Sequence, residues 1–324
     1  MKKQLLFWMV VSLLSLFQQE TYAQQDQLYY TYLFNPLALN PAYAGSSEIT
    51  SLSLVRRMRS IALQNTPSSS YFSMDFPVSP SSLSGIGLQA FYDNYSVGQA
   101  GVYLSYAYRM NVGETGTISI GLQSGFTQVR STNYLSVNEF KLNIGTGVYY
   151  RNQNAYIGVG IPSLLKTTTK ASGTGGSVSL YEFYQPVFIT AGYTLHATEK
   201  VDIKGGIVVR NYLNNAVASG KKTVFDYNAM AWFNNKLGIG LWYQNTGSEF
   251  SDTALQLSAE VNMGNFRFGY AYDFKANNGT PVSGTNPITG GVTTASGLHT
   301  LLIRYGWDSG NGKMSTPRYF KKNF

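Results

Sequence analysis

The stretch from Lys236 to Phe274 alternates between apolar side chains and small or polar side chains at almost every step. In its last segment, the apolar set is Phe266, Phe268, Tyr270, Tyr272 and Phe274, and the opposite set is Arg267, Gly269, Ala271 and Asp273. A period of two residues indicates β-strands with two different faces. The less apolar face carries Gly, Ser, Asn, Gln and single charges, which would pack a dry core badly. We therefore interpret it as the lining of a wet interior, and the apolar face as a surface in contact with lipid.

Segments with this alternation recur along most of the chain. We predict fourteen strands, at residues 48–56, 69–76, 84–93, 98–110, 115–130, 143–151, 154–161, 184–195, 199–211, 222–234, 236–245, 252–263, 265–274 and 296–307. Bacterial single-chain outer-membrane barrels have an even number of antiparallel strands and aromatic residues at both membrane interfaces. Phe266, Tyr272 and Phe274 lie where such an aromatic girdle is expected. The sequence predicts an all-β fold: a 14-stranded antiparallel transmembrane β-barrel, at residues 48–307, in the outer membrane of a Gram-negative cell.

The gaps between the predicted strands alternate in length. Gaps after odd-numbered strands include the two longest, 162–183 and 275–295, whereas gaps after even-numbered strands shrink to 152–153, 235 and 264. Long extracellular loops and short periplasmic turns are typical of these barrels, so we expect odd-numbered strands to run outward. The two longest gaps are rich in Gly, Ser, Thr and Asn, which bury too little apolar area to order themselves. We expect mobile surface loops there.

The composition fits a protein that presents its surface to lipid. Only 12% of the residues are charged and 15% are aromatic, whereas soluble domains average roughly 25% charged residues. The net charge of +8 raises the alternative of a nucleic-acid partner. The basic residues are scattered over strands and loops of an exported chain, so we attribute them to acidic lipid headgroups and to ion pairs in the lumen.

Both ends of the chain differ from the alternating part. Residues 1–23 begin with Met1-Lys2-Lys3, continue with an apolar run and end in small residues, which predicts a secretory signal peptide cleaved after Ala23. The chain contains no Cys, which excludes a lipoprotein anchor, disulfides and thiolate metal sites. Residues 308–324 form a basic tail that the strand directions place in the periplasm.

Residues 24–47 contain two Asn-Pro steps, Asn35-Pro36 and Asn40-Pro41. Each Pro lacks an N–H group and restrains the residue before it, so neither a continuous helix nor a ladder strand can form. One interpretation is a simple leader to the first strand. We favour a specifically shaped segment that packs into the barrel as a plug or lies under it in the periplasm.

A barrel of fourteen strands has a lumen too wide for its own side chains to fill, yet narrower than the open channel of 16–18 strands. Charges of both signs fall on the predicted inward face: Arg109, Lys204, Arg210, Asp226, Glu260, Arg267, Asp273 and Arg304. We expect them to pair across the lumen. Conduction then depends on what occupies the lumen, and residues 24–47 are the obvious candidate.

Motifs for catalysis, cofactors or metals are lacking. Neither His196 nor His299 has a Ser and a carboxylate at the spacing of a recognisable catalytic motif. The two histidines also lack the spacing of metal ligands. A lipid hydrolase in the barrel wall, using His299, is the one enzymatic alternative that we keep. The Gly-x-Gly pairs that begin at residues 85, 145, 158 and 238 lie inside strands and lack the following helix of a phosphate loop. We expect them to let the wall curve or to leave room for a packed segment.

The block Phe34-Asn35-Pro36-Leu37-Ala38-Leu39-Asn40-Pro41-Ala42-Tyr43-Ala44-Gly45 resembles the opening of the PorP/SprF family of type IX secretion membrane proteins. Later phrases are similar to family phrases and follow in family order, among them Tyr156–Leu165, Phe266–Asp273 and Pro317–Phe320. The Asn-Pro block is the specific part of this resemblance, and we carry only that block over as a family signature.

The resemblance implies a non-enzymatic outer-membrane barrel of the type IX secretion and gliding apparatus. Members are similar in helping to export particular proteins, notably surface adhesins with a type B C-terminal domain, and in holding them at the cell surface. The implied partners are the C-terminal domain of such a cargo, components of the periplasmic ring and outer-membrane lipid, with no cofactor. The alternative is a passive or substrate-specific porin.

Overall fold

The structure is a computed structural model that describes residues 34–47, 49–58, 68–78, 83–94, 98–131, 137–173, 176–183, 185–213, 223–245, 253–274, 282–285, 292–295 and 297–307. The predicted signal peptide, the predicted basic tail and most of the first predicted surface loop lie outside these residues.

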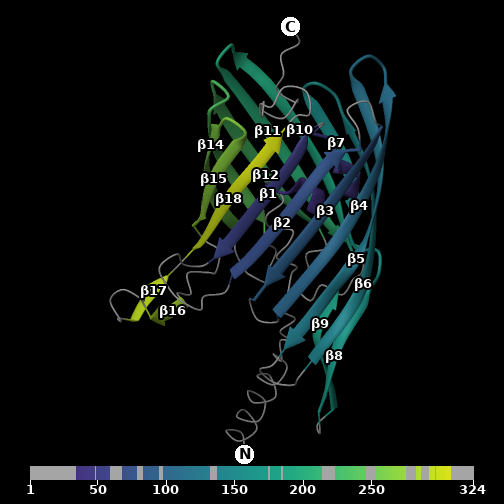
Figure 1. Ribbon diagram of the computed structural model, residues 1–324. Helices are drawn as coiled ribbons and strands as arrows, with labels where there is room; N and C mark the ends of the chain where they lie inside the picture. The colour runs from purple at the N-terminus through teal and green to yellow at the C-terminus, as the bar shows by residue number, and fades with distance from the viewer. Residues whose placement is uncertain are drawn as a thin grey trace, which may run out of the picture.

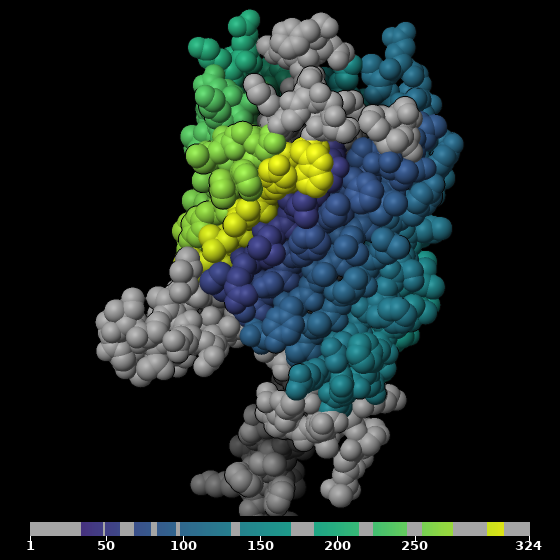
Figure 2. All heavy atoms as spheres, viewed as in Figure 1, coloured from purple at the N-terminus to yellow at the C-terminus, as the bar shows by residue number. Residues whose placement is uncertain are grey.

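Fourteen strands form a closed wall, as predicted (Figure 1). They are β1 (Thr50–Met58), β2 (Ser68–Pro77), β3 (Ser84–Asp93), β4 (Gly98–Val112), β5 (Gly116–Ser131), β6 (Val137–Arg151), β7 (Ala155–Ile161), β10 (Pro186–Thr198), β11 (Val201–Tyr212), β12 (Thr223–Phe233), β13 (Leu237–Asn245), β14 (Thr253–Met263), β15 (Phe266–Asp273) and β18 (Leu298–Trp307). Neighbouring strands are antiparallel, and β1 closes the cylinder by pairing with β18 from Thr50↔Trp307 to Met58↔His299. In Figure 2 the yellow band of β18 runs directly beside the purple band of β1.

Side chains alternate between an exposed apolar outer face and a buried inner face along the wall. On β4, for example, Val102 and Leu104 are exposed, whereas Tyr103 and Ser105 between them are buried. Aromatic rings gather near both ends of the outer face, with Phe266 beside Tyr305 at one end of β15 and Tyr272 beside Phe274 at the other. This is the surface that a bilayer with two interfacial belts requires. The helical turns in the described part of the chain all lack the length and hydropathy of a bilayer-spanning helix.

Tight turns join the strands at one end of the barrel. Gly113 and Gly264 adopt left-handed backbone angles there, with φ of +66° and +62°. Asn234 and Asn235, which join β12 to β13, also have positive φ, a conformation that Asn tolerates better than most residues. We call this the short-turn end and the opposite one the long-loop end.

The structure contains more strand than predicted in three places. β6 begins at Val137 rather than at residue 143, because residues 137–142 continue the ladder with β5 although Asn138, Glu139 and Lys141 are polar. The gap 162–183 contains the hairpin β8 (Thr167–Gly173) and β9 (Gly176–Phe183), and the gap 275–295 contains β16 (Val282–Thr285) and β17 (Val292–Ala295). In the two hairpins, which lie outside the barrel wall, backbone pairing alone suffices for a strand, so apolar alternation misses them.

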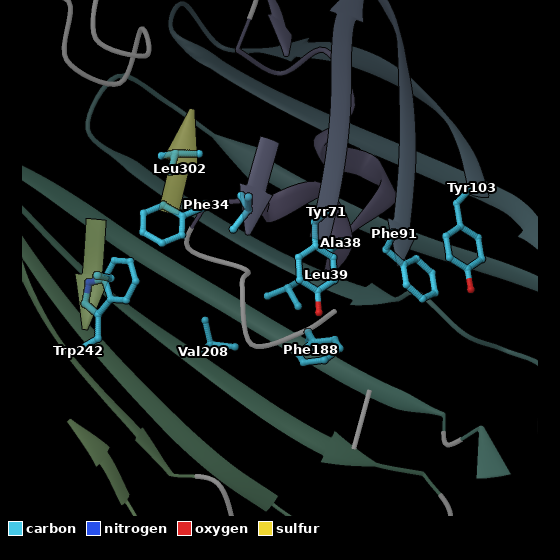
Figure 3. Close-up of a cluster of buried hydrophobic side chains, with 12 residues drawn as sticks. Phe34, Ala38, Leu39, Tyr71, Phe91, Tyr103, Phe188, Val208, Trp242 and Leu302 are labelled. Carbon is cyan, nitrogen blue, oxygen red and sulfur yellow. The ribbon is translucent and has the colours of Figure 1, made fainter. Parts of the chain in front are cut away.

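A cluster of buried apolar side chains lies inside the cylinder (Figure 3). The wall contributes Tyr71, Phe91, Tyr103, Phe188, Val208, Trp242 and Leu302, among others, and Phe34, Ala38 and Leu39 come from a segment before the first strand. That segment contains two 3-10 turns, η2 (Pro36–Ala38) and η3 (Pro41–Tyr43). The core of the barrel is therefore built around its N-terminal segment.

Candidate functional site

Residues Phe34–Ser47, here called the lumen segment, contain two successive 3-10 turns, each starting at the Pro of an Asn-Pro step. Pro36 and Pro41 occupy the first turn positions, where a missing N–H costs nothing. The Asn40 side chain caps the second turn by accepting a hydrogen bond from the N–H of Ala42 at 2.9 Å. The Asn-Pro steps thus produce a compact, irregular shape without a long helix.

Asn40 also fixes the lumen segment to the wall. Its Nδ2 donates to the carbonyl oxygens of Val148 on β6 and Val159 on β7, at 2.9 and 3.3 Å. A Cβ at Gly147 would lie 2.1 Å from the Asn40 Oδ1 atom, and one at Gly160 would lie 2.1 Å from the carbonyl oxygen of Leu39. The prediction that Gly-x-Gly pairs leave room for a packed segment is confirmed at these positions.

Further close approaches occur at Gly87 and Gly121. A Cβ at Gly121 would lie 2.2 Å from the backbone N of Ala42, and one at Gly87 would meet the Leu37 side chain at 2.7 Å. Gly121 does not belong to a Gly-x-Gly pair, and sequence reasoning missed it. Its inward place in the β5 alternation was the available indication.

The C-terminal end of the lumen segment is held by a buried carboxylate and a buried guanidinium. The N–H of Gly45 and the hydroxyl of Ser47 each donate to Asp75 Oδ2 at 3.2 Å. Arg109 donates to the carbonyl oxygen of Gly45 and, at 3.0 Å, to that of Ser84. Hydrogen bonds to charged groups are stronger than neutral ones, so this end of the segment is firmly bound.

The N-terminal end of the lumen segment is held on another part of the wall. Arg304 on β18 donates to the carbonyl oxygen of Phe34. The Phe34 ring packs at 5.3 Å from the Trp242 ring. Between the two ends, Gln89 Nε2 donates to the carbonyl oxygen of Leu37 at 3.2 Å. The segment is therefore attached to β18, β13 and β3 as well as to β6 and β7.

The eleven family-signature residues all belong to the lumen segment. Most are buried, and Pro36 and Tyr43 are half-buried; the full set is Phe34, Asn35, Pro36, Leu37, Leu39, Asn40, Pro41, Ala42, Tyr43, Ala44 and Gly45.

The structure places the eight expected lumen charges on the inward face of the wall, namely Arg109, Lys204, Arg210, Asp226, Glu260, Arg267, Asp273 and Arg304. Arg109 and Arg304 bind the lumen segment, as described above. Arg267 pairs with Glu260 at 3.5 Å, and its guanidinium lies 4.6 Å from the centroid of the Trp232 ring. The ammonium group of Lys204 lies 5.4 Å from the centroid of the Tyr156 ring.

Three polar residues that act on this site were missed from the sequence. Asp75 and Gln89 bind the lumen segment, and Arg57 pairs with Asp273 at 3.3 Å in the buried interior. Asp75 and Gln89 fall on the inward face of predicted strands, and Arg57 directly follows the predicted strand 48–56, so the alternation could have placed them in the lumen. Their partners could not have been predicted from it.

Two of the spaces in the described part of the lumen lie beside the segment. One of about 630 Å³ lies between the segment and β6, β7, β10, β11 and β12, lined by Tyr149, Tyr156 and Lys204 among others. The other, of about 480 Å³, lies near Asp75, Arg267 and Arg304. The lumen is thus partly filled.

The two histidines lie away from the lumen segment. His299 is on the outer face, where its Nδ1 lies 2.8 Å from the Tyr270 hydroxyl. His196 lies near the β10–β11 turn, 2.6 Å from an Asp202 carboxylate oxygen. Nowhere in the described ranges do three or more metal-ligating side chains gather closely enough to hold an ion.

Solved structures with a similar fold are bacterial outer-membrane barrels. The Pseudomonas putida toluene transporter TodX has a TM-score of 0.48 and 10% identity, covering 87% of this chain and 94% of its own. A Pseudomonas aeruginosa FadL homologue has a TM-score of 0.48 and 9% identity, covering 84% of this chain and 93% of its own. The Ralstonia pickettii toluene transporter TbuX has a TM-score of 0.44 and 12% identity, covering 82% of this chain and 91% of its own. These values are too low to carry an argument about function.

Sequence comparison is more specific. No curated protein matches the chain. The family described as "Type IX secretion system membrane protein PorP/SprF" matches residues 21–289, which is most of the chain. The protein is therefore an outer-membrane β-barrel that belongs to the PorP/SprF family of type IX secretion system membrane proteins.

Proposed function

We propose that this barrel helps to export a specific cargo protein, a surface adhesin with a type B C-terminal domain, and anchors it at the cell surface. The observation that carries the proposal is the lumen segment. It is bound at one end by Asp75 and Arg109 and at the other by Arg304. A barrel whose lumen is occupied by its own firmly bound segment is better suited to docking a partner than to conducting solute.

The two ends of the barrel support different contacts. The long-loop end carries the hairpins β8–β9 and β16–β17, on the same side of the molecule in Figure 1. We assign this end to the cell exterior, where it meets the C-terminal domain of the cargo. The short-turn end then faces the periplasm and the ring components of the secretion apparatus. The apolar outer wall contacts outer-membrane lipid.

The proposed role involves no catalysis. His299, the residue that an embedded lipid hydrolase would use, faces outward and is hydrogen-bonded to Tyr270. A hydrolase needs a nucleophile and an orienting carboxylate around its histidine, and the aromatic surroundings of His299 offer neither among the described residues. Unchanged lipid composition in membranes that contain His299→Ala would agree with this.

The test is deletion of the gene in the bacterium that carries it. Quantitative immunoblots would measure the adhesin on intact cells and in the medium, with a strain complemented by the wild-type gene as control. We expect the adhesin to be lost from the surface and restored by complementation. If the adhesin still reaches the surface and stays attached in the deletion strain, the proposal is wrong.

A porin is the second candidate, and the space of about 630 Å³ beside the lumen segment favours it. Single-channel recordings of the purified barrel in planar bilayers separate the two functions. Steady, large openings of the wild-type protein would support a porin. We expect a silent barrel that conducts only after the lumen segment is displaced.

A further inference from the structure

The wall is interrupted beside β6. The ladder between β6 and β7 extends only from Arg151↔Tyr156 to Thr146↔Ile161, whereas β6 continues to Val137 in its ladder with β5. After Ile161 the chain leaves the wall, and it resumes as β8, which pairs with β9 and not with β6. The half of β6 from Val137 to Gly145 therefore has a strand on one side only.

Specific side chains hold the departing chain on the inner side of β6. The carbonyl oxygen of Pro162 accepts hydrogen bonds from Gln123 Nε2 at 2.9 Å and from Asn143 Nδ2 at 3.1 Å. Both amides are buried and face inward. A Cβ at Gly145 would lie 2.6 Å from the same Pro162 oxygen. Lys141 then donates to the carbonyl oxygen of Thr168 on β8 at 3.4 Å. The inward turn of the chain after Ile161 is thus stabilised by specific hydrogen bonds.

The consequence is an open strand edge on β6. The carbonyl oxygen of Ile144 points toward this edge, because it accepts the N–H of Leu164 at 2.8 Å. Backbone groups of alternate residues in a strand point to the same edge, so those of Leu142, Phe140 and Asn138 point there too. Within the described part of the chain, these three residues have no backbone partner on that side.

The open edge lies at the level of the lipid-facing shell near the long-loop end. Phe140 is 68% exposed and Leu142 44% exposed on the outer face. Gln128, which is opposite Phe140 in the ladder, and Asn138, two residues before Phe140, mark the change to polar outer residues. Lipid tails cannot satisfy backbone N–H and C=O groups, which costs several kcal/mol for each group left in hydrocarbon. A β-strand is the occupant that supplies backbone partners and apolar side chains together.

We infer that the open edge of β6, at residues 138–142, is the docking site for an extended strand of the exported partner. The inference rests on the proposed function. The docked strand pairs with Asn138, Phe140 and Leu142. Its side chains alternate, with apolar ones beside Phe140 and Leu142 and polar ones beside Lys141 and Asn143. The cargo is thereby held through backbone hydrogen bonds at the membrane surface.

The experiment compares Leu142→Lys with Phe126→Lys. Leu142 and Phe126 are opposite each other in the β5–β6 ladder, so both substitutions add one charge at the same depth of the outer face. Only Leu142 borders the open edge, because Phe126 also pairs with Val102 on β4. A lysine on an edge strand opposes strand addition. We expect Leu142→Lys to reduce surface-retained adhesin about tenfold and Phe126→Lys to leave it at the wild-type level.

Heat-modifiable migration in SDS gels checks that each variant forms a barrel. A photo-reactive residue at position 142, with position 126 as control, provides a measurement that does not depend on the lysine variants. In intact cells it should form an adduct with the adhesin's C-terminal domain at position 142 only. An adduct with lipid, with a second copy of this chain or with its own N-terminal residues, or no adduct, would overturn the inference.

Failure of the inference is distinguishable from failure of the proposed function. If gene deletion releases the adhesin but both lysine variants retain it, the edge of β6 is not the docking site and the anchoring function stands. If gene deletion itself leaves the adhesin attached, the proposed function fails first.

Discussion

The lumen segment packs differently against the two sides of the barrel. On the side of β4, β5 and β6, the turn η3 lies against the wall, and a Cβ at Gly121 would come within 2.2 Å of the backbone of Ala42. On the side of β10, β11 and β12, a space lies between part of the segment and the wall. A Cβ at Gly206 there would meet only the ends of side chains, the Asn228 amide at 2.9 Å and the Tyr156 hydroxyl at 3.2 Å.

The difference shows two uses of glycine in a barrel wall. Where one backbone lies on another, no side chain fits between them, and glycine determines where the segment docks. Where only the tip of a flexible side chain approaches, glycine is replaceable. The closest backbone-to-backbone contacts of the lumen segment thus lie on one side of the barrel, and the other side leaves space for water or solute.

The largest effect is expected from Gly121→Leu. The new side chain would occupy the position of the Ala42 backbone, and overpacking of this kind costs about 1–3 kcal/mol or more. Because the wall cannot yield without breaking its ladder, we expect the segment to leave the lumen. Planar-bilayer recordings should show steady openings, with Gly206→Ala as the silent control. Silence in both variants would contradict one-sided docking.

Asp75→Ala tests the attachment at Gly45. The substitution removes the acceptor of the Gly45 N–H and the Ser47 hydroxyl. Loss of a hydrogen bond to a charged group typically costs about 1.5–3 kcal/mol. Amide hydrogen exchange should show a matching fall in the free energy of opening of residues 38–46. Asp226→Asn, on β12, serves as control, and equal exchange in both variants would refute the expectation.

Asn40→Ala removes the cap of η3 and two hydrogen bonds to the wall at Val148 and Val159. Loss of a cap costs about 1 kcal/mol, and carbonyls left unsatisfied add about 1–3 kcal/mol. We expect faster exchange at Tyr43 and Ala44, with the barrel itself intact in SDS gels. Asn228→Ala, across the open space, should leave the exchange of these amides unchanged. Equal changes in this exchange in the two variants would show that both sides hold the segment.

The smallest effect on docking is expected from Lys204→Met. Lys204 lines the open space, and its ammonium group contacts the Tyr156 ring, an interaction of about 1 kcal/mol. We expect the free energy of opening of the lumen segment, measured by amide hydrogen exchange, to change by less than about 1 kcal/mol. In the Gly121→Leu background, reversal potentials should shift toward cations, since a positive charge has left the lumen wall. A large loss of protection in the segment would show that the open side also determines docking.

Most of the wall could be predicted from the sequence. The predicted strand at 84–93 coincides with β3, and the count of fourteen is correct, because contact with lipid on one face and with the lumen on the other forces a local period of two. The start of β6 was missed because three of the four residues Asn138–Lys141 are polar, which interrupts the apolar face of the alternation. The hairpins β8–β9 and β16–β17 were missed because they lie outside the barrel wall, where lipid does not impose that period.

Local sequence alone determined the strands, the faces of the wall and the irregular shape of the Asn-Pro block, because each depends on neighbouring residues and on the solvent that they meet. Only the tertiary structure decided that Gly45 meets Asp75, that Phe34 meets Arg304 and that Pro162 turns toward Asn143. These contacts depend on barrel closure and strand register, which join residues as far apart as 270 positions in the chain. A period of two assigns a residue to a face, and it cannot assign a partner on that face.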